Sequence, residues 1–111
     1  MKFSAVRRFA LSLPETTEEP HFDYSSFRVR GKIFVTVTPP GEYIHVFVDD
    51  LEREWALTVA PEWAEKLWWG KKVVGLRVHL AAARAALVKE WVRDAWARKA
   101  PKRLSGSSAR R

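Results

Sequence analysis

The chain of 111 residues has the length of one domain, and 47% of them are hydrophobic, with six Trp and six Phe to fill a core. It has no cysteine, which excludes disulfide bonds and cysteine-ligated metal sites. No apolar run approaches the roughly 20 residues that span a bilayer, and Arg7 and Arg8 interrupt any N-terminal signal segment. We therefore expect a cytoplasmic protein with no membrane attachment.

The formal net charge of +7 is unevenly distributed along the chain. Residues 71–111 hold twelve Lys and Arg against two acidic residues, a net charge of +10. Residues 49–70 hold two basic and six acidic residues, a net charge of −4. Residues 1–48 hold six basic and five acidic residues, a net charge of +1. Such a field attracts polyanions, of which nucleic acid is the commonest in a cell. Internal pairing of the acidic middle with the basic end is the alternative, and it would leave a less basic surface.

The first half of the chain predicts one helix followed by three strands. Apolar residues at helical spacing over 3–13 predict an amphipathic helix that ends before Pro14. Residues 15–24 are polar and contain Pro20, which favours a connector. Alternating residues in 27–29 and 33–37 predict a hairpin around Gly31, and a third strand over 43–48 follows a turn at 39–42.

The second half predicts short helices, a strand and a long helix. Asp49 or Asp50 is suited to cap a helix marked by Leu51, Trp55 and Val59. Pro61 favours a further helical turn or two through residue 67, before a loop at 68–72 and a fourth strand over 73–79. Residues 81–99 predict a helix with one apolar side. These elements indicate an α+β fold with one domain over residues 1–104 and a flexible basic tail over 105–111.

No pattern in the sequence predicts catalysis or a cofactor. His21, His45 and His79 lack the spacing of a metal motif, although the last two lie on different predicted strands and can meet in space. Asp49 and Asp50 are adjacent, and capping already accounts for one of them. There is no glycine-rich phosphate loop and no nucleophile motif. We therefore expect no enzyme, no metal and no cofactor.

Two basic segments are candidates for binding nucleic acid. Alternation places Arg28 and Arg30 on one face of the predicted hairpin, with Lys32 at its turn, a shape that can follow phosphates. A solvated strand face that protects a sheet edge is the alternative. The second segment, residues 68–72, joins two tryptophans to two lysines and suits base stacking beside phosphate contacts. We expect one of these tryptophans to be buried and the other partly exposed.

Three stretches resemble the MmcQ/YjbR family, small bacterial proteins usually described as DNA-binding. They are residues 11–22 (LSLPETTEEPHF), 26–34 (SFRVRGKIF) and 100–104 (APKRL). The resemblance covers residues 3–104 and implies a CyaY-like α+β fold, with an antiparallel sheet packed against N- and C-terminal helices. By position, Arg28, Arg30 and Lys32 match the family's basic hairpin, and Trp69-Gly70 matches its Trp-Gly turn.

The sequence thus predicts a non-enzymatic nucleic-acid-binding module of weak sequence specificity, with DNA as the first expected partner and a monomer or weak homodimer as its state. The alternative is a protein-interaction or small-ligand module that uses an aromatic pocket around Phe34, Tyr43, Phe47 and the tryptophans. The predicted nucleic-acid contacts are Arg28, Arg30, Lys32, Trp68, Trp69, Lys71, Lys72, Arg77, Lys102 and Arg103.

Overall fold

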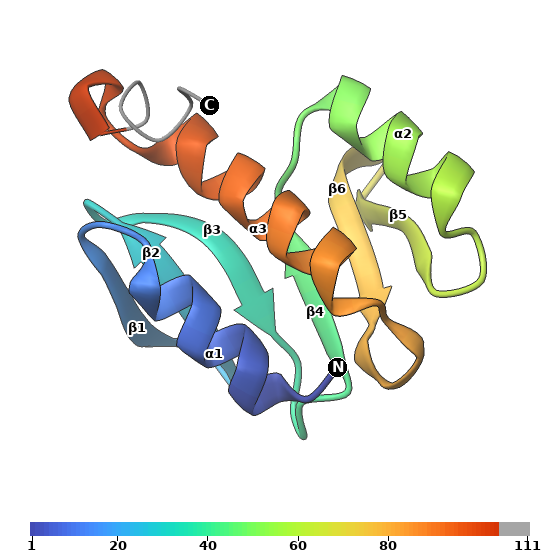
Figure 1. Ribbon diagram of the computed structural model, residues 1–111, viewed down its shortest axis with the longest axis horizontal. Coiled ribbons are helices and arrows are strands. Elements are labelled where there is room, and N and C mark those ends of the chain that lie inside the picture. Colours follow the sequence, from blue (N-terminus) through green and yellow to red (C-terminus); the bar gives the residue numbers. More distant parts are fainter. Residues whose placement is uncertain (105–111) are drawn as a thin grey trace.

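The computed structural model describes residues 1–104 and consists of one antiparallel sheet of six strands with three α-helices (Figure 1). The strand order is β1-β2-β3-β4-β6-β5. The elements are α1 (Phe3–Ser12), β1 (Thr16–His21), β2 (Tyr24–Val29), β3 (Lys32–Val37), β4 (Tyr43–Val46), α2 (Asp50–Val59), β5 (Ala64–Trp69), β6 (Lys72–His79) and α3 (Ala85–Lys99), with a single 3-10 turn at Leu80–Ala82.

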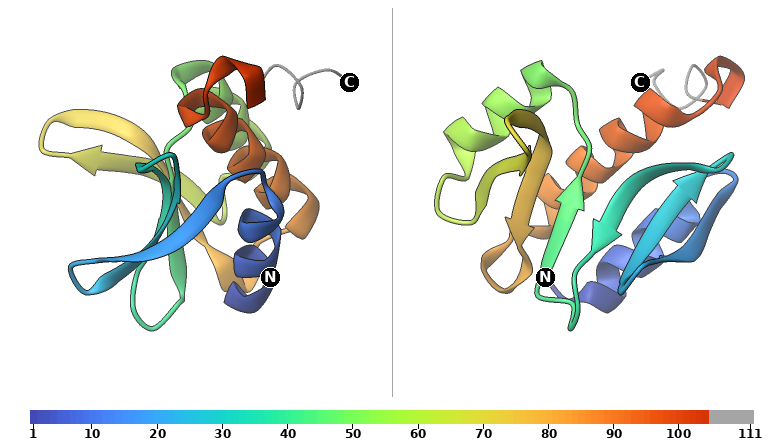
Figure 2. Two further views of the ribbon diagram at one scale, coloured as in Figure 1. Left: turned by 90° about the vertical axis from the view of Figure 1, so that its left-hand side faces the viewer. Right: turned by 180° about the vertical axis from the view of Figure 1, so that it is seen from behind.

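All three helices cover the same face of the sheet. In Figure 1, α1 lies beside β1 and β2, α3 crosses the middle, and α2 lies beside β5 and β6. The view from behind in Figure 2 shows the other face without helices. This arrangement confirms the predicted α+β fold, in which an antiparallel sheet packs against the terminal helices.

The core lies between the sheet and α3. Trp91 and Trp96 of α3 have no exposed surface, and they pack over inward-facing strand residues such as Ile44 and Leu76. The Trp63 ring lies 5.3 Å from that of Trp91 and extends the core toward β5. Burial of aromatic rings of this size contributes a large share of the stability of a small domain.

The predicted hairpin is present as β2 and β3. Arg30 and Gly31 form its turn with φ angles of 53° and 83°. Positive φ at both central residues matches the twist of the two strands, and glycine adopts it without a steric cost. Phe27 and Val29 are fully buried, as the alternation predicts.

The connector predicted over residues 15–24 is wrong, because residues 16–21 form β1. This strand pairs with β2 along its whole length, from Thr16 opposite Val29 to His21 opposite Tyr24. It is an edge strand, where proline is tolerated because one side needs no hydrogen-bond donor. Its polar composition, which suggested a connector, reflects that exposed position.

The helical turn predicted after Pro61 and the loop predicted over 68–72 are also wrong. Residues 64–69 form β5, which pairs with β6 across a turn of only two residues, Gly70 and Lys71. Gly70 has a φ of 64°, a left-handed conformation that favours glycine. Good helix formers in this segment become a strand because pairing with β6 outweighs their local preference.

The other helices and strands differ from prediction mainly at their ends. The third strand, β4, ends at Val46, and α3 begins at Ala85 because the 3-10 turn precedes it. In α2 the buried residue is Ala56, while Leu51 and Trp55 are 82% and 55% exposed. The apolar spacing therefore located the helix correctly but not the face that packs on the sheet.

Within residues 1–104 no helix combines the length and the apolar character needed to cross a bilayer. The tail predicted over residues 105–111 lies outside the described residues, so its predicted flexibility stays a prediction.

Gly75 of β6 lies close against the backbone at the end of β4. A Cβ atom at this position would collide with the carbonyl oxygen of Val46 and lie 3.1 Å from the Cα atom of Phe47. Both are backbone atoms, so only separation of the two central strands makes room. We expect Gly75→Ala to lower the free energy of unfolding by about 1–3 kcal/mol, measured by urea denaturation. An unchanged midpoint and slope would contradict this close approach.

Candidate functional site

The topology brings several predicted contact segments to one end of the sheet. In an antiparallel sheet alternate turns lie at the same end, so the β2–β3 turn, the end of β4 and the β5–β6 turn are neighbours there. In the left view of Figure 2 the β5–β6 hairpin projects away from the helices. The C-terminal end of α3 reaches the same region, because Arg98 contacts Phe47 just after β4.

A hollow of about 1000 Å³ opens at this end of the molecule. Its lining combines two aromatic residues, Phe47 and Trp69, with aliphatic Ile33 and Val73. His21 and Thr36 also line the hollow, together with three cationic residues and two acidic ones. The charged residues are Arg28, Arg98, Lys99, Asp49 and Asp50.

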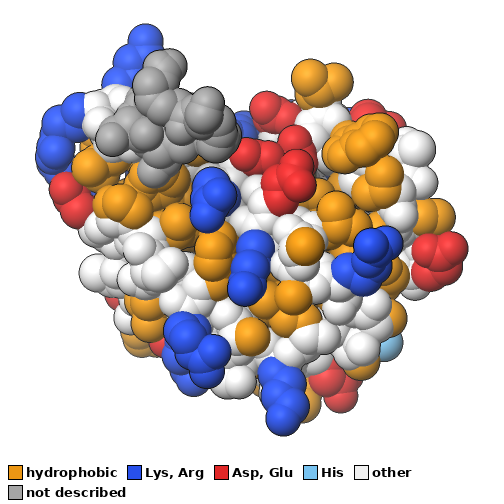
Figure 3. Space-filling model, in the orientation of Figure 1, with side chains coloured by type: hydrophobic (Ala, Val, Ile, Leu, Met, Phe, Trp, Pro, Cys, Tyr) orange, Lys and Arg blue, Asp and Glu red, His pale blue; other side chains and the backbone are white. Residues whose placement is uncertain are grey.

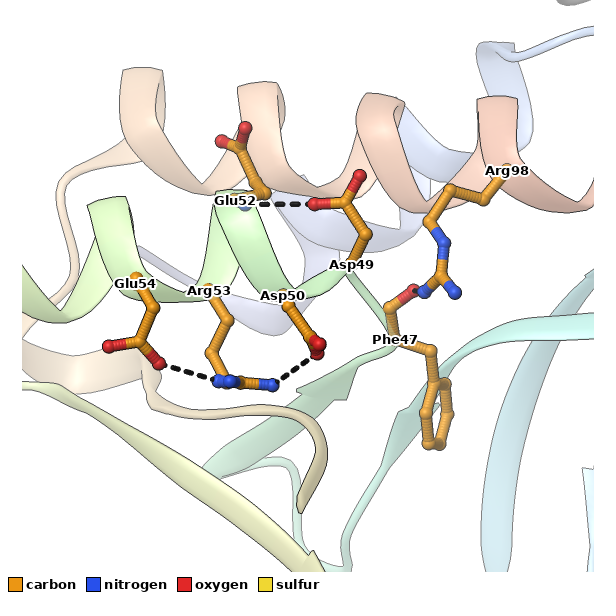
Figure 4. A network of polar contacts seen from close by, with 7 residues as sticks. All are labelled: Phe47, Asp49, Asp50, Glu52, Arg53, Glu54 and Arg98. Carbon is orange, nitrogen blue, oxygen red and sulfur yellow. Dashed lines mark hydrogen bonds and ion pairs between the residues drawn. The ribbon is translucent and has the colours of Figure 1, made fainter. Parts of the chain in front are cut away.

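Short polar contacts hold one wall of the hollow in place (Figure 4). Arg98 donates from Nη1 to the Phe47 carbonyl oxygen at 2.7 Å, which ties α3 to the end of β4. Asp49 accepts the Glu52 N–H at 2.8 Å and caps α2, as predicted for Asp49 or Asp50. Asp50 pairs with Arg53 at 2.7 Å.

Both tryptophans of the β5–β6 hairpin are exposed, so the prediction of one buried ring is wrong. Trp68 is 57% and Trp69 79% exposed. Neighbouring strand residues point to opposite faces, so Trp69 lines the hollow while Trp68 lines a smaller depression beside Leu57 and Pro61. Both escape burial because β5 is an edge strand and its tip projects away from the helices.

The lysines of this hairpin form no ion pair within the described chain. Lys71 lies in the turn and Lys72 lies opposite Trp69, and both are exposed. No carboxylate of residues 1–104 lies within 4.0 Å of either ammonium group. Two exposed aromatic rings therefore lie beside two cations whose charge is not neutralised by a direct ion pair.

The arginines of the β2–β3 hairpin instead contact acidic residues in β1 and immediately before it. Arg30 pairs with Glu15 at 2.9 Å, and Arg103 approaches the same carboxylate at 3.5 Å. Arg28 donates to the Ser26 hydroxyl and lies 3.9 Å from Glu19. Sequence reasoning missed these acidic partners because their segment was assigned to a connector rather than to the strand beside β2.

Arg77 lies on the open face of the sheet, away from the hollow. It pairs with Glu65 at 2.9 Å and its guanidinium group lies 3.7 Å from the centre of the Tyr43 ring. This is one instance of internal pairing between the acidic middle and the basic end of the chain, which was the alternative to a free basic surface. Lys32 and Lys102, the other predicted contacts, are both exposed.

His45 and His79, whose predicted strands allowed them to meet in space, lie on the same face of the sheet but have other partners. His79 stacks on Tyr43 with ring centres 4.8 Å apart, and His45 contacts the Thr36 hydroxyl at 3.3 Å. Burial, followed by the positive charge of Arg77, lowers the pKa of His45. Both effects favour the neutral form of the His45 ring.

The family model YjbR matches residues 11–98. The chain belongs to the YjbR family. This finding confirms the resemblance noted in the sequence. A similar solved structure is the crystal structure of Deinococcus radiodurans protein DR2400, with the domain DUF419. It shares 17% identity with this YjbR chain at a TM-score of 0.75, covering 86% of this chain and 76% of the other.

At that identity the likeness supports the fold alone. No curated protein matches the chain significantly. The two family descriptions name neither a reaction nor a ligand, so function has to be argued from the site of this YjbR chain itself.

A second polar cluster lies between α2 and α3, away from the predicted contacts. Carboxylate oxygens of Glu52, Glu90 and Asp94 come within 4.8 Å of one another. Figure 3 shows acidic side chains over α2 beside exposed hydrophobic ones, whereas basic side chains spread over α3. Burial, then the charges of Asp94, Glu90 and Asp49, raise the pKa of Glu52 to about 7.

This shift makes the stability of the YjbR chain depend on pH. The pKa of Glu52 is higher in the folded protein than its ordinary value of 4.5, so folding takes up a proton. The stabilisation that comes from protonated Glu52 is fully present at pH values below its ordinary pKa of 4.5. It is lost as the pH rises through the folded-state pKa of about 7. We expect Glu52→Gln to reduce the fall in melting temperature between about pH 5 and about pH 8. Glu62→Gln, at an exposed position, is the control, and equal pH profiles for Glu52→Gln and the wild type would refute the assignment.

Proposed function

We propose that this YjbR-family chain is a non-enzymatic module that binds nucleic acid, DNA in the first instance, at the end of the sheet where the β5–β6 hairpin projects. The observation that carries the proposal is the hairpin itself. Trp68 and Trp69 are exposed there beside Lys71 and Lys72, which have no carboxylate within ion-pair distance in residues 1–104. Cations beside aromatic faces are the combination that binds phosphates and bases together.

The affinity is expected to be largely electrostatic. Lysines at the turn neutralise phosphates and release counterions, so binding weakens as the salt concentration rises. Lys99 lies at the hollow and the exposed Lys102 follows α3, which extends the basic region. Few of these side chains are suited to hydrogen-bond base edges, which supports weak sequence specificity.

The other predicted contacts have a smaller part in this proposal. Arg30 and Arg103 share the carboxylate of Glu15, so a phosphate has to compete with an existing ion pair. Arg77 is held by Glu65 and Tyr43 in the same way. Exposed ion pairs are weak, about 1 kcal/mol or less, so this competition reduces their contribution without abolishing it.

The hollow also supports the alternative of a small-ligand site, because Phe47 and Trp69 line it together. Of the other aromatic residues predicted for such a pocket, Phe34 is fully buried and Tyr43 lies beneath Arg77. A small ligand would therefore contact only part of the predicted aromatic set. The absence of any nucleic-acid binding would favour this alternative.

The test is fluorescence anisotropy of a labelled mixed-sequence DNA titrated with the protein from about 50 to about 200 mM salt. We expect the double variant Lys71→Ala/Lys72→Ala to bind about tenfold more weakly at the lowest salt. We also expect the slope of log K against log salt to become shallower by about one to two, because two phosphate contacts are lost.

Lys2→Ala/Arg8→Ala is the matched control, since it removes the same charge from exposed positions at α1. If both double variants lose affinity equally, net charge rather than the hairpin determines binding. If the wild type binds no DNA at about 50 mM salt, the proposed function is wrong.

A further inference from the structure

We infer that the hollow receives the bases of single-stranded nucleic acid, with Trp69 as the stacking surface and phosphates held along the basic rim. This inference rests on the proposed function and adds the class of nucleic acid. It follows from how apolar, cationic and acidic groups are arranged around one cavity.

The interior of the hollow is suited to bases rather than to phosphates. Trp69 is 79% exposed and shares the cavity with Phe47, Ile33 and Val73. Exposing an indole to water costs free energy that a stacked base recovers. Phosphate oxygens gain nothing from these apolar walls.

The charges around the hollow favour the same orientation. Lys72 lies directly opposite Trp69 across the β5–β6 pair, and Lys99 closes another side. Asp49 and Asp50 also line the cavity, and Asp50 retains a highly exposed carboxylate despite its pair with Arg53. Carboxylates repel a phosphate that enters the cavity, whereas they accept hydrogen bonds from the N–H groups of bases, including the ring N–H of thymine. Arg28 and Arg98 also line the cavity, but Arg28 donates to the Ser26 hydroxyl and the Pro20 carbonyl oxygen, and Arg98 donates to the Phe47 carbonyl oxygen. Lys72 and Lys99 form no ion pair within residues 1–104, so phosphates are favoured at these lysines and bases inside the hollow.

A duplex does not fit this arrangement. Its bases are stacked on one another and present only their edges, so they offer no face to Trp69. Single strands expose the faces of their bases, and stacking on an aromatic side chain tolerates every sequence. Preference for single strands thus follows from the exposed ring inside the hollow and not from the charge alone.

The experiment compares a labelled 15-nucleotide oligo(dT) with a 15-base-pair mixed duplex at one low salt concentration. We expect the wild type to bind the single strand more tightly and its tryptophan fluorescence to be quenched. Trp69→Ala should weaken single-strand binding about fivefold or more and leave duplex binding within about twofold. Trp69→Phe should restore most of the loss, since it keeps an aromatic face.

Trp55→Ala is the matched control, because Trp55 is also exposed but lies on α2 near Glu52 and Glu54. Circular dichroism would verify that each variant is folded. Equal affinities for both DNAs, or single-strand binding that is insensitive to Trp69→Ala, would overturn this inference. If the single-strand inference failed but Lys71→Ala/Lys72→Ala still weakened DNA binding, the proposed function would stand. If the wild type bound neither DNA, both the inference and the proposed function would be wrong.

Discussion

The packing of α3 across the sheet is the contact on which the rest of the structure depends. Trp91 and Trp96 are buried completely, and Trp96 donates from Nε1 to the Pro14 carbonyl oxygen at 3.0 Å, which ties α3 to the corner between α1 and β1. Because the helix is anchored there, its last turn lies over the end of β4, where Arg98 binds the Phe47 carbonyl oxygen. The core thereby determines where the hollow lies and which cations line it.

The distribution of ion pairs separates two kinds of basic surface. On the β1 side, Glu15 and Glu18 engage Arg30 and Arg7 at 2.9 and 2.8 Å. Such pairs hold elements together but contribute little net positive charge to the surface. On the β5 side, the turn carries Lys71 and Lys72 away from the acidic strand. Lys71 and Lys72 at the hairpin tip, and Lys99 and Lys102 near the end of α3, form no ion pair within residues 1–104.

The exposed aromatic rings have a physical cost that the fold does not require. Trp68 and Trp69 extend past the helices because β5 stays paired with β6 as far as Lys72, the first residue of β6. A tip of smaller polar residues would close the same turn, since Gly70 supplies the left-handed conformation. Exposed large apolar groups of this kind are typical of binding surfaces. The two exposed rings therefore support the proposed role of the hairpin in binding rather than in stability.

The sequence alone determined those helices, strands and turns that depend on residues close together in the chain. The hairpin around Gly31, the cap at Asp49 and the long helix with its apolar side were predicted because alternation, side-chain capping and helical spacing are local properties. Only the tertiary structure decided β1 and β5, since both are edge strands whose polar or helix-favouring residues become strands by pairing with β2 and β6. It also decided which charges are neutralised. Glu15 meets Arg30 and Arg103 only after the chain folds, because ion pairs depend on distances in space that no spacing along the sequence specifies.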